Sequence, residues 1–86
     1  MPIISAFFGI VIRMYYDDHN PPHMHAEYQG QKCVIDFRGN MLKGEITSKA
    51  ALRLIREWID LHVNELSEDW EFARTGKDVK KIAPLE

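Results

Sequence analysis

The chain has 86 residues, of which 45% are hydrophobic and 28% charged, and its formal net charge is −2. This composition is typical of one small globular domain, and it excludes a disordered tail. Folding at this size removes only about 60% of the unfolded chain's surface from water, so a partner protein or a second copy could add to its stability.

Cysteine usage and hydropathy restrict the compartment. Cys33 is the single cysteine, so an internal disulfide is excluded. The apolar start over residues 3–12 is too short to span a bilayer and has no basic segment before it. We therefore expect a cytoplasmic protein with no membrane partner.

The N-terminal half is rich in β-branched and aromatic residues and predicts strands. Three strands and a short fourth are expected at residues 7–16, 23–28, 31–37 and 41–46. The first is expected to end at a turn containing Pro21 and Pro22, and the others at turns containing Gly30 and Gly39.

From Thr47 the hydrophobic period becomes that of a helix, with Thr47 or Ser48 as the N-cap and no glycine or proline before Gly76. The apolar residues fill more than half of the helix circumference. Such a helix must be covered from two sides, by the sheet and by a second helix or another chain. We expect a helical hairpin or a sharp bend near Asn64 to Ser67, and Ser67 could begin a second, shorter helix.

The predicted architecture is α+β, with an antiparallel sheet of three to four N-terminal strands packed against two C-terminal helices. Residues 1–86 form a single domain, with strands at about 6–46, helices at 47–75 and a basic tail at 76–86. The tail is expected either to dock as a strand or to be mobile.

Side chains alternate between the two faces of a sheet, so the apolar core assignment also fixes a polar outer face. On the first strand, Tyr15 shares this outer face with Arg13. The set that matching strands should bring together there is Arg13, His23, His25, Glu27 and Asp36.

Three of the four histidines lie in the stretch DHNPPHMHAEY, which ends at Tyr28, and three readings compete. His19, His23 and His25 could bind a divalent transition metal, because imidazole suits zinc, iron or nickel. Alternatively, one imidazole acts as a general acid or base and a guanidinium stabilises an anion. In the third reading the histidines only stabilise the turn or contact a partner. The predicted catalytic set is His23, His25, Arg13 and Glu27.

Four segments together resemble a bacterial family, domain of unknown function 4160. They are PIISAFFGIVIRMYYDDHNPPHMHAEY, ALRLIREWIDLHVNEL, DWEFARTGK and KKIAPL. The family's signature residues present here are Asp18, His19, Asn20, Pro21, Pro22, His23, His25 and Ala26, with Trp70 and Ala73 in the later motif.

The resemblance implies the toxin of a type II toxin–antitoxin module, of the Dhi type. It also implies a cognate small antitoxin as partner, which we expect to bind the helical face. The leading hypothesis is thus a toxin that acts on RNA or a nucleotide as a histidine-dependent enzyme. The alternative is a non-enzymatic protein- or metal-binding module that uses the DHNPPHMH loop.

Overall fold

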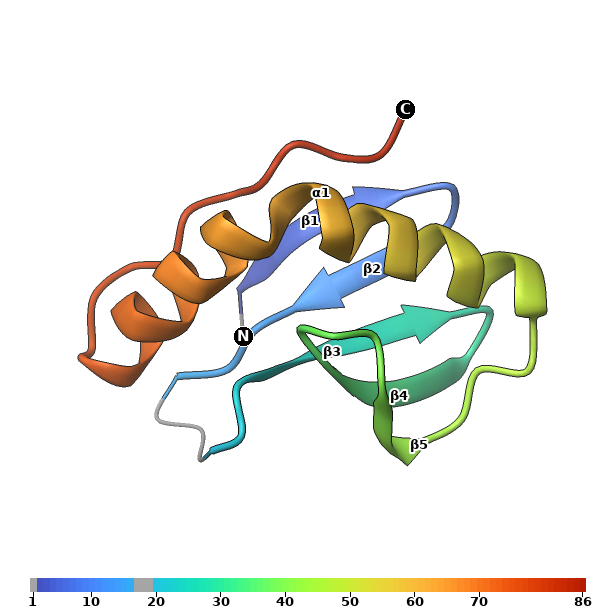
Figure 1. Ribbon diagram of the computed structural model, residues 1–86, viewed down its shortest axis with the longest axis horizontal. Coiled ribbons are helices and arrows are strands. Elements are labelled where there is room, and N and C mark those ends of the chain that lie inside the picture. The colour runs from blue at the N-terminus through green and yellow to red at the C-terminus, as the bar shows by residue number, and fades with distance from the viewer. Residues whose placement is uncertain (1, 17–19) are drawn as a thin grey trace.

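The computed structural model describes residues 2–16 and 20–86 and has an α+β fold, as the sequence predicts. An antiparallel sheet with strand order β1-β2-β3-β4-β5 is covered on one face by one helix (Figure 1). The elements are β1 (Ile3–Phe7), β2 (Ile10–Arg13), β3 (His23–Tyr28), β4 (Gln31–Asp36), β5 (Met41–Gly44) and α1 (Lys49–Arg74). The sheet therefore has five strands rather than three or four, and one helix replaces the expected two.

The additional strand is β1, which lies almost entirely before the segment 7–16 predicted as one long strand and forms a hairpin with β2. Phe7 pairs with Ile10 across a two-residue turn formed by Phe8 and Gly9. Both turn residues have positive φ, +51° and +79°, as the tightest hairpin turns require. Glycine adopts this conformation readily, whereas Phe8 is an unusual residue there and its side chain is 59% exposed.

The helix runs without interruption through Ser67, where a second helix was expected to begin. The helix is kinked at His62, two residues before the range where a bend was expected, because the φ of −125° and ψ of 21° at His62 are not helical. The Ser48 hydroxyl accepts a hydrogen bond from the Ala51 N–H at 3.1 Å and caps the N-terminus. Gly76, with positive φ, follows the last turn as predicted. In the part of the chain that the structure describes, no helix is long and apolar enough to cross a membrane.

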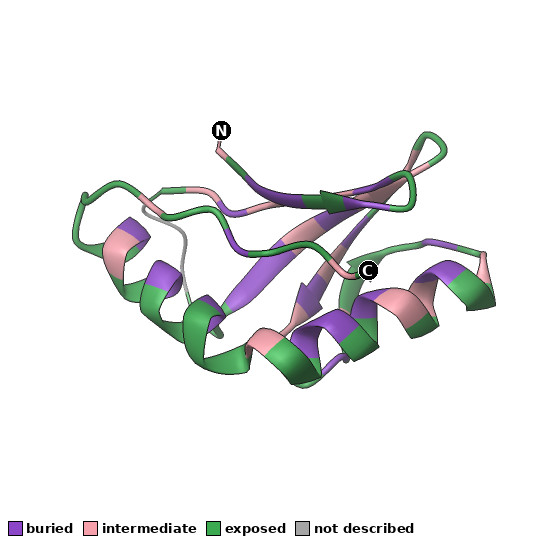
Figure 2. Ribbon diagram, turned by 90° about the horizontal axis from the view of Figure 1, so that it is seen from above, coloured by how far each residue is buried: buried purple, intermediate pink, exposed green. Residues whose placement is uncertain are grey.

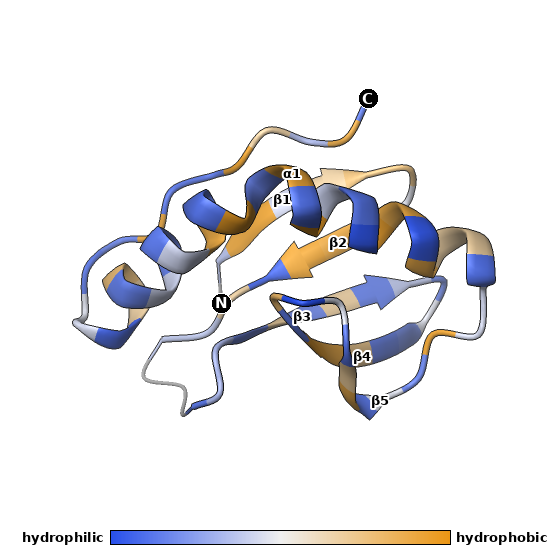
Figure 3. Cartoon of the chain, in the orientation of Figure 1, coloured by the Kyte–Doolittle hydropathy of each residue, from blue (hydrophilic) through white to orange (hydrophobic). Residues whose placement is uncertain are grey.

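The hydrophobic core lies between the sheet and α1, and the side of α1 turned to the sheet carries its buried residues (Figure 2). Figure 3 shows the same division as hydropathy, because the exposed side of α1 is mostly hydrophilic. The predicted alternation is confirmed on β2 to β4, which supply the buried residues Ile10, Ile12, Met24, Ala26, Cys33 and Ile35. The helix supplies Ala51, Ile55, Trp58, Ile59 and Leu66.

The C-terminal tail covers part of the second side of the helix, where a second helix or another chain was expected. It runs beside both β1 and α1 (Figures 1 and 2). The Ile82 N–H donates to the Ile4 carbonyl at 2.7 Å, and the Trp58 indole N–H donates to the Ala83 carbonyl at 2.8 Å. Of the two expectations for the tail, docking is the one observed, although it forms no regular strand.

Candidate functional site

The candidate site is built on one row of cross-strand neighbours on the sheet face that α1 does not cover. Arg13 of β2 pairs with His25 of β3, His25 pairs with Val34 of β4, and Val34 pairs with Lys43 of β5. Directly opposed residues in neighbouring strands point to the same side of the sheet. The register of four strands therefore places two cations, an imidazole and an apolar side chain side by side.

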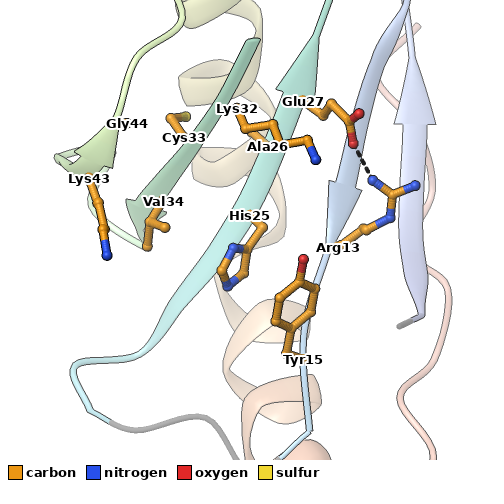
Figure 4. Close-up of a pocket in the computed structure, with 10 residues that line it drawn as sticks. All are labelled: Arg13, Tyr15, His25, Ala26, Glu27, Lys32, Cys33, Val34, Lys43 and Gly44. Carbon is orange, nitrogen blue, oxygen red and sulfur yellow. Dashed lines mark hydrogen bonds and ion pairs between the residues drawn. The ribbon is translucent and has the colours of Figure 1, made fainter. Parts of the chain in front are cut away.

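A hollow of about 570 Å³ lies over this row (Figure 4). Its lining residues are Arg13, Tyr15, His25, Ala26, Glu27, Lys32, Cys33, Val34, Lys43 and Gly44. Three of these residues are cations and one is a carboxylate, although the whole chain carries a net charge of −2. Among the described residues, the lining is therefore locally positive on a weakly acidic protein, which favours an anionic ligand.

Two contacts organise the lining side chains. The ring of Tyr15 stacks on that of His25, with centroids 4.0 Å apart and planes 14° from parallel. The Arg13 guanidinium forms an ion pair with the Glu27 carboxylate (Figure 4). Glu27 lies two residues after His25 on β3, on the same face of the sheet. Glu27 in turn lies directly opposite Lys32 of β4. The stack orients the imidazole from one side, while the ion pair holds the guanidinium next to it.

His23 departs from the expected arrangement, because the sequence predicts both imidazoles on the open outer face. His25 lies there, whereas His23 is only 7% exposed. The last turns of α1 reach past the start of β3, and the Trp70 ring packs 5.3 Å from the His23 ring. The two imidazoles remain neighbours, with centroids 5.4 Å apart and an edge-on geometry. The role of His23 in acid/base chemistry stays a prediction.

One ring nitrogen of His23 forms a hydrogen bond to the backbone. Its Nδ1 lies 2.7 Å from the carbonyl oxygen of Pro21. A carbonyl only accepts hydrogen bonds, so Nδ1 must carry the hydrogen and donate it. The polypeptide before β3 therefore holds the ring of His23, which lies edge-on to the ring of His25.

The predicted metal site involves a residue that the structure does not place. His19 lies outside the described residues, so its grouping with His23 and His25 stays a prediction. Within residues 2–16 and 20–86, no group of three histidine, cysteine, aspartate or glutamate side chains is arranged to hold a metal ion.

Asp36 belongs to a turn rather than to the hollow. Its carboxylate accepts hydrogen bonds at 2.9 Å from the backbone N–H groups of Arg38 and Asn40. Partial burial opposes ionisation, but these two hydrogen bonds and the Asn40 side chain outweigh it and lower the pKa of the carboxyl. A carboxylate stabilised in this way closes the β4–β5 turn and is a poor proton acceptor.

Cys33 is among the lining residues of the hollow, but it is buried and belongs to the hydrophobic core. Burial raises the pKa of its thiol. The backbone hydrogen bond with Ala26 and the charge of Arg56 lower that pKa, but the effect of burial is larger. A thiol in this state is inert packing, so the cysteine is not a candidate nucleophile.

Sequence reasoning missed two contributors to the site, Lys32 and Lys43. Both could have been placed on the outer face from alternation once the strand register was known. The register of β5 was not readable, because an irregularity in its pairing lies between Val34 and Ile35. Tyr15 was assigned to the correct face, but its stacking on His25 depends on the diagonal geometry of two strands.

One comparison with known proteins gives a match, to a family model. Residues 9–71, from the β1–β2 turn to the last turns of α1, match the family described as Domain of unknown function (DUF4160). No curated protein and no solved structure matches the chain. The matched segment contains every residue of the cross-strand row and more than half of the chain. The chain therefore belongs to the family Domain of unknown function (DUF4160).

Proposed function

We propose that the protein is the toxin of a toxin–antitoxin pair and acts on RNA or a nucleotide through the outer face of its sheet. The observation that carries this proposal is the cross-strand row. In it, His25 lies next to Arg13 on one side and next to Val34 on the other, and Lys43 follows Val34. An imidazole beside a guanidinium suits cleavage of a phosphate ester, in which a proton moves while negative charge develops on oxygen.

His25 has the general base role in this proposal. Imidazole changes protonation near neutral pH, so it can accept the proton of an attacking hydroxyl group. The Arg13 guanidinium is the neighbouring group that stabilises the developing negative charge on the phosphate. Glu27 holds that guanidinium in place through their ion pair. Glu27 therefore acts on the reaction through Arg13, as a positioning residue.

His23 has a positioning role, because it is buried and does not line the hollow. Its hydrogen bond to Pro21 and its packing on Trp70 fix the ring that lies against His25. This assignment changes the predicted acid/base pair into one reacting imidazole supported by a second. Replacing His23 should therefore lower the free energy of unfolding as well as activity, whereas replacing His25 should lower activity alone.

The partner in this proposal is a small antitoxin that docks on the helix near its bend. Leu61 and Val63, on either side of the bend at His62, are 66% and 40% exposed. These are bulky apolar side chains that neither the sheet nor the tail covers. Leu61→Ser together with Val63→Ser should weaken binding of the antitoxin and leave growth inhibition by the toxin alone unchanged.

The proposal is tested by growth inhibition on induced expression of His25→Gln. Glutamine keeps the polar character of the position but cannot act as a base, so we expect inhibition to be lost while the unfolding curve is unchanged. His62→Gln is the matched control, since His62 contacts Glu65 on the helix, far in the fold from the outer face. This control should still inhibit growth.

Full growth inhibition by a folded His25→Gln variant would contradict the proposal. If inhibition survived that substitution but was lost in the Leu61 and Val63 variants, the protein would be a binding module that acts through its helix. The two outcomes separate an enzyme from an adaptor with the same set of variants.

A further inference from the structure

We infer that the outer face binds single-stranded RNA, with a base stacked on Tyr15 and backbone phosphates contacted by Lys32 and Lys43. This inference rests on the proposed function and names the substrate class of the same site. It distinguishes a polynucleotide strand from a mononucleotide and from a duplex.

The shape of the site favours a polymer over a free nucleotide. Small-molecule sites are concave and bury most of their ligand between opposing walls. Here α1 lies on the opposite face of the sheet and the tail runs beside β1, so no described helix covers the outer face (Figures 1 and 2). A mononucleotide would remain largely in water on such a face. A strand can bind to it through several weak contacts, each supplied by a different nucleotide.

The distribution of charge indicates more than one phosphate position. Lys43 is two strand spacings from His25, about 10 Å between backbones. Its side chain extends along β5 rather than toward His25 (Figure 4). Arg13 is held by Glu27 on the other side of the imidazole. A phosphate beside His25 and a phosphate at Lys43 are therefore successive groups of one chain.

The ammonium groups of Lys32 and Lys43 are available to contact phosphates. Within the described residues, neither makes an ion pair, in contrast to Arg13, Arg74 and Lys80. Both side chains are exposed and lie on adjacent strands. Lysines of this kind follow a flexible backbone without reading its sequence.

The aromatic contact excludes a duplex as the preferred ligand. Tyr15 and His25 form a flat stacked pair in the floor of a positively charged face. Unpaired bases can splay out and stack on such a pair, whereas the bases of a duplex are already stacked on each other. RNA in addition supplies the hydroxyl group that the reaction needs.

The chemical step on this substrate balances without another reagent. The 2′ oxygen bonds to phosphorus while the bond from phosphorus to the 5′ oxygen breaks, which leaves a cyclic phosphate and a 5′ hydroxyl group. His25 takes the proton of the 2′ hydroxyl, the departing 5′ oxygen takes a proton from solvent, and His25 later returns its proton to solvent. DNA lacks this nucleophile and would bind without being cleaved.

The test is fluorescence anisotropy of the full-length protein with a short, mixed-sequence single strand of 2′-O-methyl RNA, which cannot be cleaved by this route. The same sequence as a duplex and adenosine monophosphate as a competitor complete the comparison. We expect tight, salt-dependent binding of the single strand only. Lys32→Ala and Lys43→Ala should each lower the slope of log affinity against log salt by about 0.7. Tyr15→Leu should weaken binding about tenfold through lost stacking.

Lys49→Ala is the matched control, because Lys49 is an exposed lysine on α1, in the layer on the opposite side of the sheet. Its salt slope should equal that of the unmodified protein. Preferred binding of the duplex, competition by the mononucleotide at equal concentration, or unchanged slopes in both lysine variants would each overturn the inference. If this happened while His25→Gln still abolished growth inhibition, the substrate class would be wrong and the proposed function would stand.

Discussion

The two faces of the sheet are made by alternate residues of the same strands, yet they do different things. On β2, Ile12 is fully buried against the helix, while its neighbour Arg13 lines the open hollow. On β3, Ala26 is buried and His25 and Glu27 face outward. The inner face supplies the stability of the fold, and the outer face uses the resulting rigid frame to hold polar groups at fixed spacings.

This division means that the functional face can change without loss of the fold. Folding removes little of the surface of the outer side chains from contact with water, so their replacement has a small effect on stability. Inner side chains are close-packed, and each carries a large share of the marginal stability of a small domain. The predictions below compare substitutions on the two faces, beginning with the largest expected effect.

Ile12→Ala should lower the free energy of unfolding by about 2–5 kcal/mol, because it removes buried methyl groups and leaves a cavity. Val11→Ala, one residue earlier and half-buried on the outer side, should cost less than about 1 kcal/mol. Urea unfolding followed by tryptophan fluorescence measures both. Equal losses for the two variants would contradict the assignment of faces.

The alternation behind this pair was readable from the sequence, and so were the class of the fold, the turn at Gly30 and the helix N-cap. The hairpin at Phe8 and Gly9 was not, because a phenylalanine at positive φ runs against its intrinsic preference. The burial of His23 could not be predicted either, since it depends on where Trp70 lies after a long helix with a bend. Local pattern fixes which way a side chain points, whereas tertiary packing decides what covers it.

Gly44→Ala should lower the free energy of unfolding by about 1–3 kcal/mol through backbone strain at its positive φ. A Cβ at this position would also collide with the Lys32 carbonyl oxygen and lie 3.1 Å from the Cys33 Cα. Gly30 has the same positive φ but open space around it, so Gly30→Ala is the control and should cost less. Chemical denaturation of both variants checks this, and an equal cost would show that the close approach of β5 to β4 is unimportant.

Two carboxyl groups should give stability changes of opposite sign with pH. Burial raises the pKa of Asp69, and the charges of Glu68 and Glu65 add to this, while the Lys80 N–H and ammonium group oppose it. A raised pKa in the folded state means that stability falls as the pH rises from the ordinary aspartate pKa to the raised one. The lowered pKa of Asp36 gives the reverse, a contribution lost as the pH falls below the ordinary value.

The measurement is urea unfolding across acidic pH for the unmodified protein, Asp69→Asn and Asp36→Asn. Asparagine at 69 keeps the oxygen that accepts from the Lys80 N–H at 2.9 Å. The stability of the unmodified protein minus that of Asp69→Asn should decrease with rising pH. The corresponding difference for Asp36→Asn should increase. Parallel slopes for the two differences would contradict the assignment of burial to Asp69 and hydrogen bonding to Asp36.

Arg13→Gln should have the smallest effect on stability, less than about 1 kcal/mol, because its ion pair with Glu27 is partly exposed and screened by solvent. The same variant should lose most growth inhibition, since the phosphate charge is no longer stabilised. Thermal unfolding and growth on induction measure the two effects. A large loss of stability with retained inhibition would mean that the pair is structural.

The central claim is that the outer face of the sheet, rather than the helix, binds the substrate. The most direct measurement is a two-dimensional NMR titration of the labelled protein with single-stranded 2′-O-methyl RNA. The claim predicts that signals of Tyr15, His25, Val34 and Lys43 shift together and saturate at one concentration, while those of Leu61 and Val63 do not move. Shifts confined to the helix near Leu61 and Val63 would contradict it.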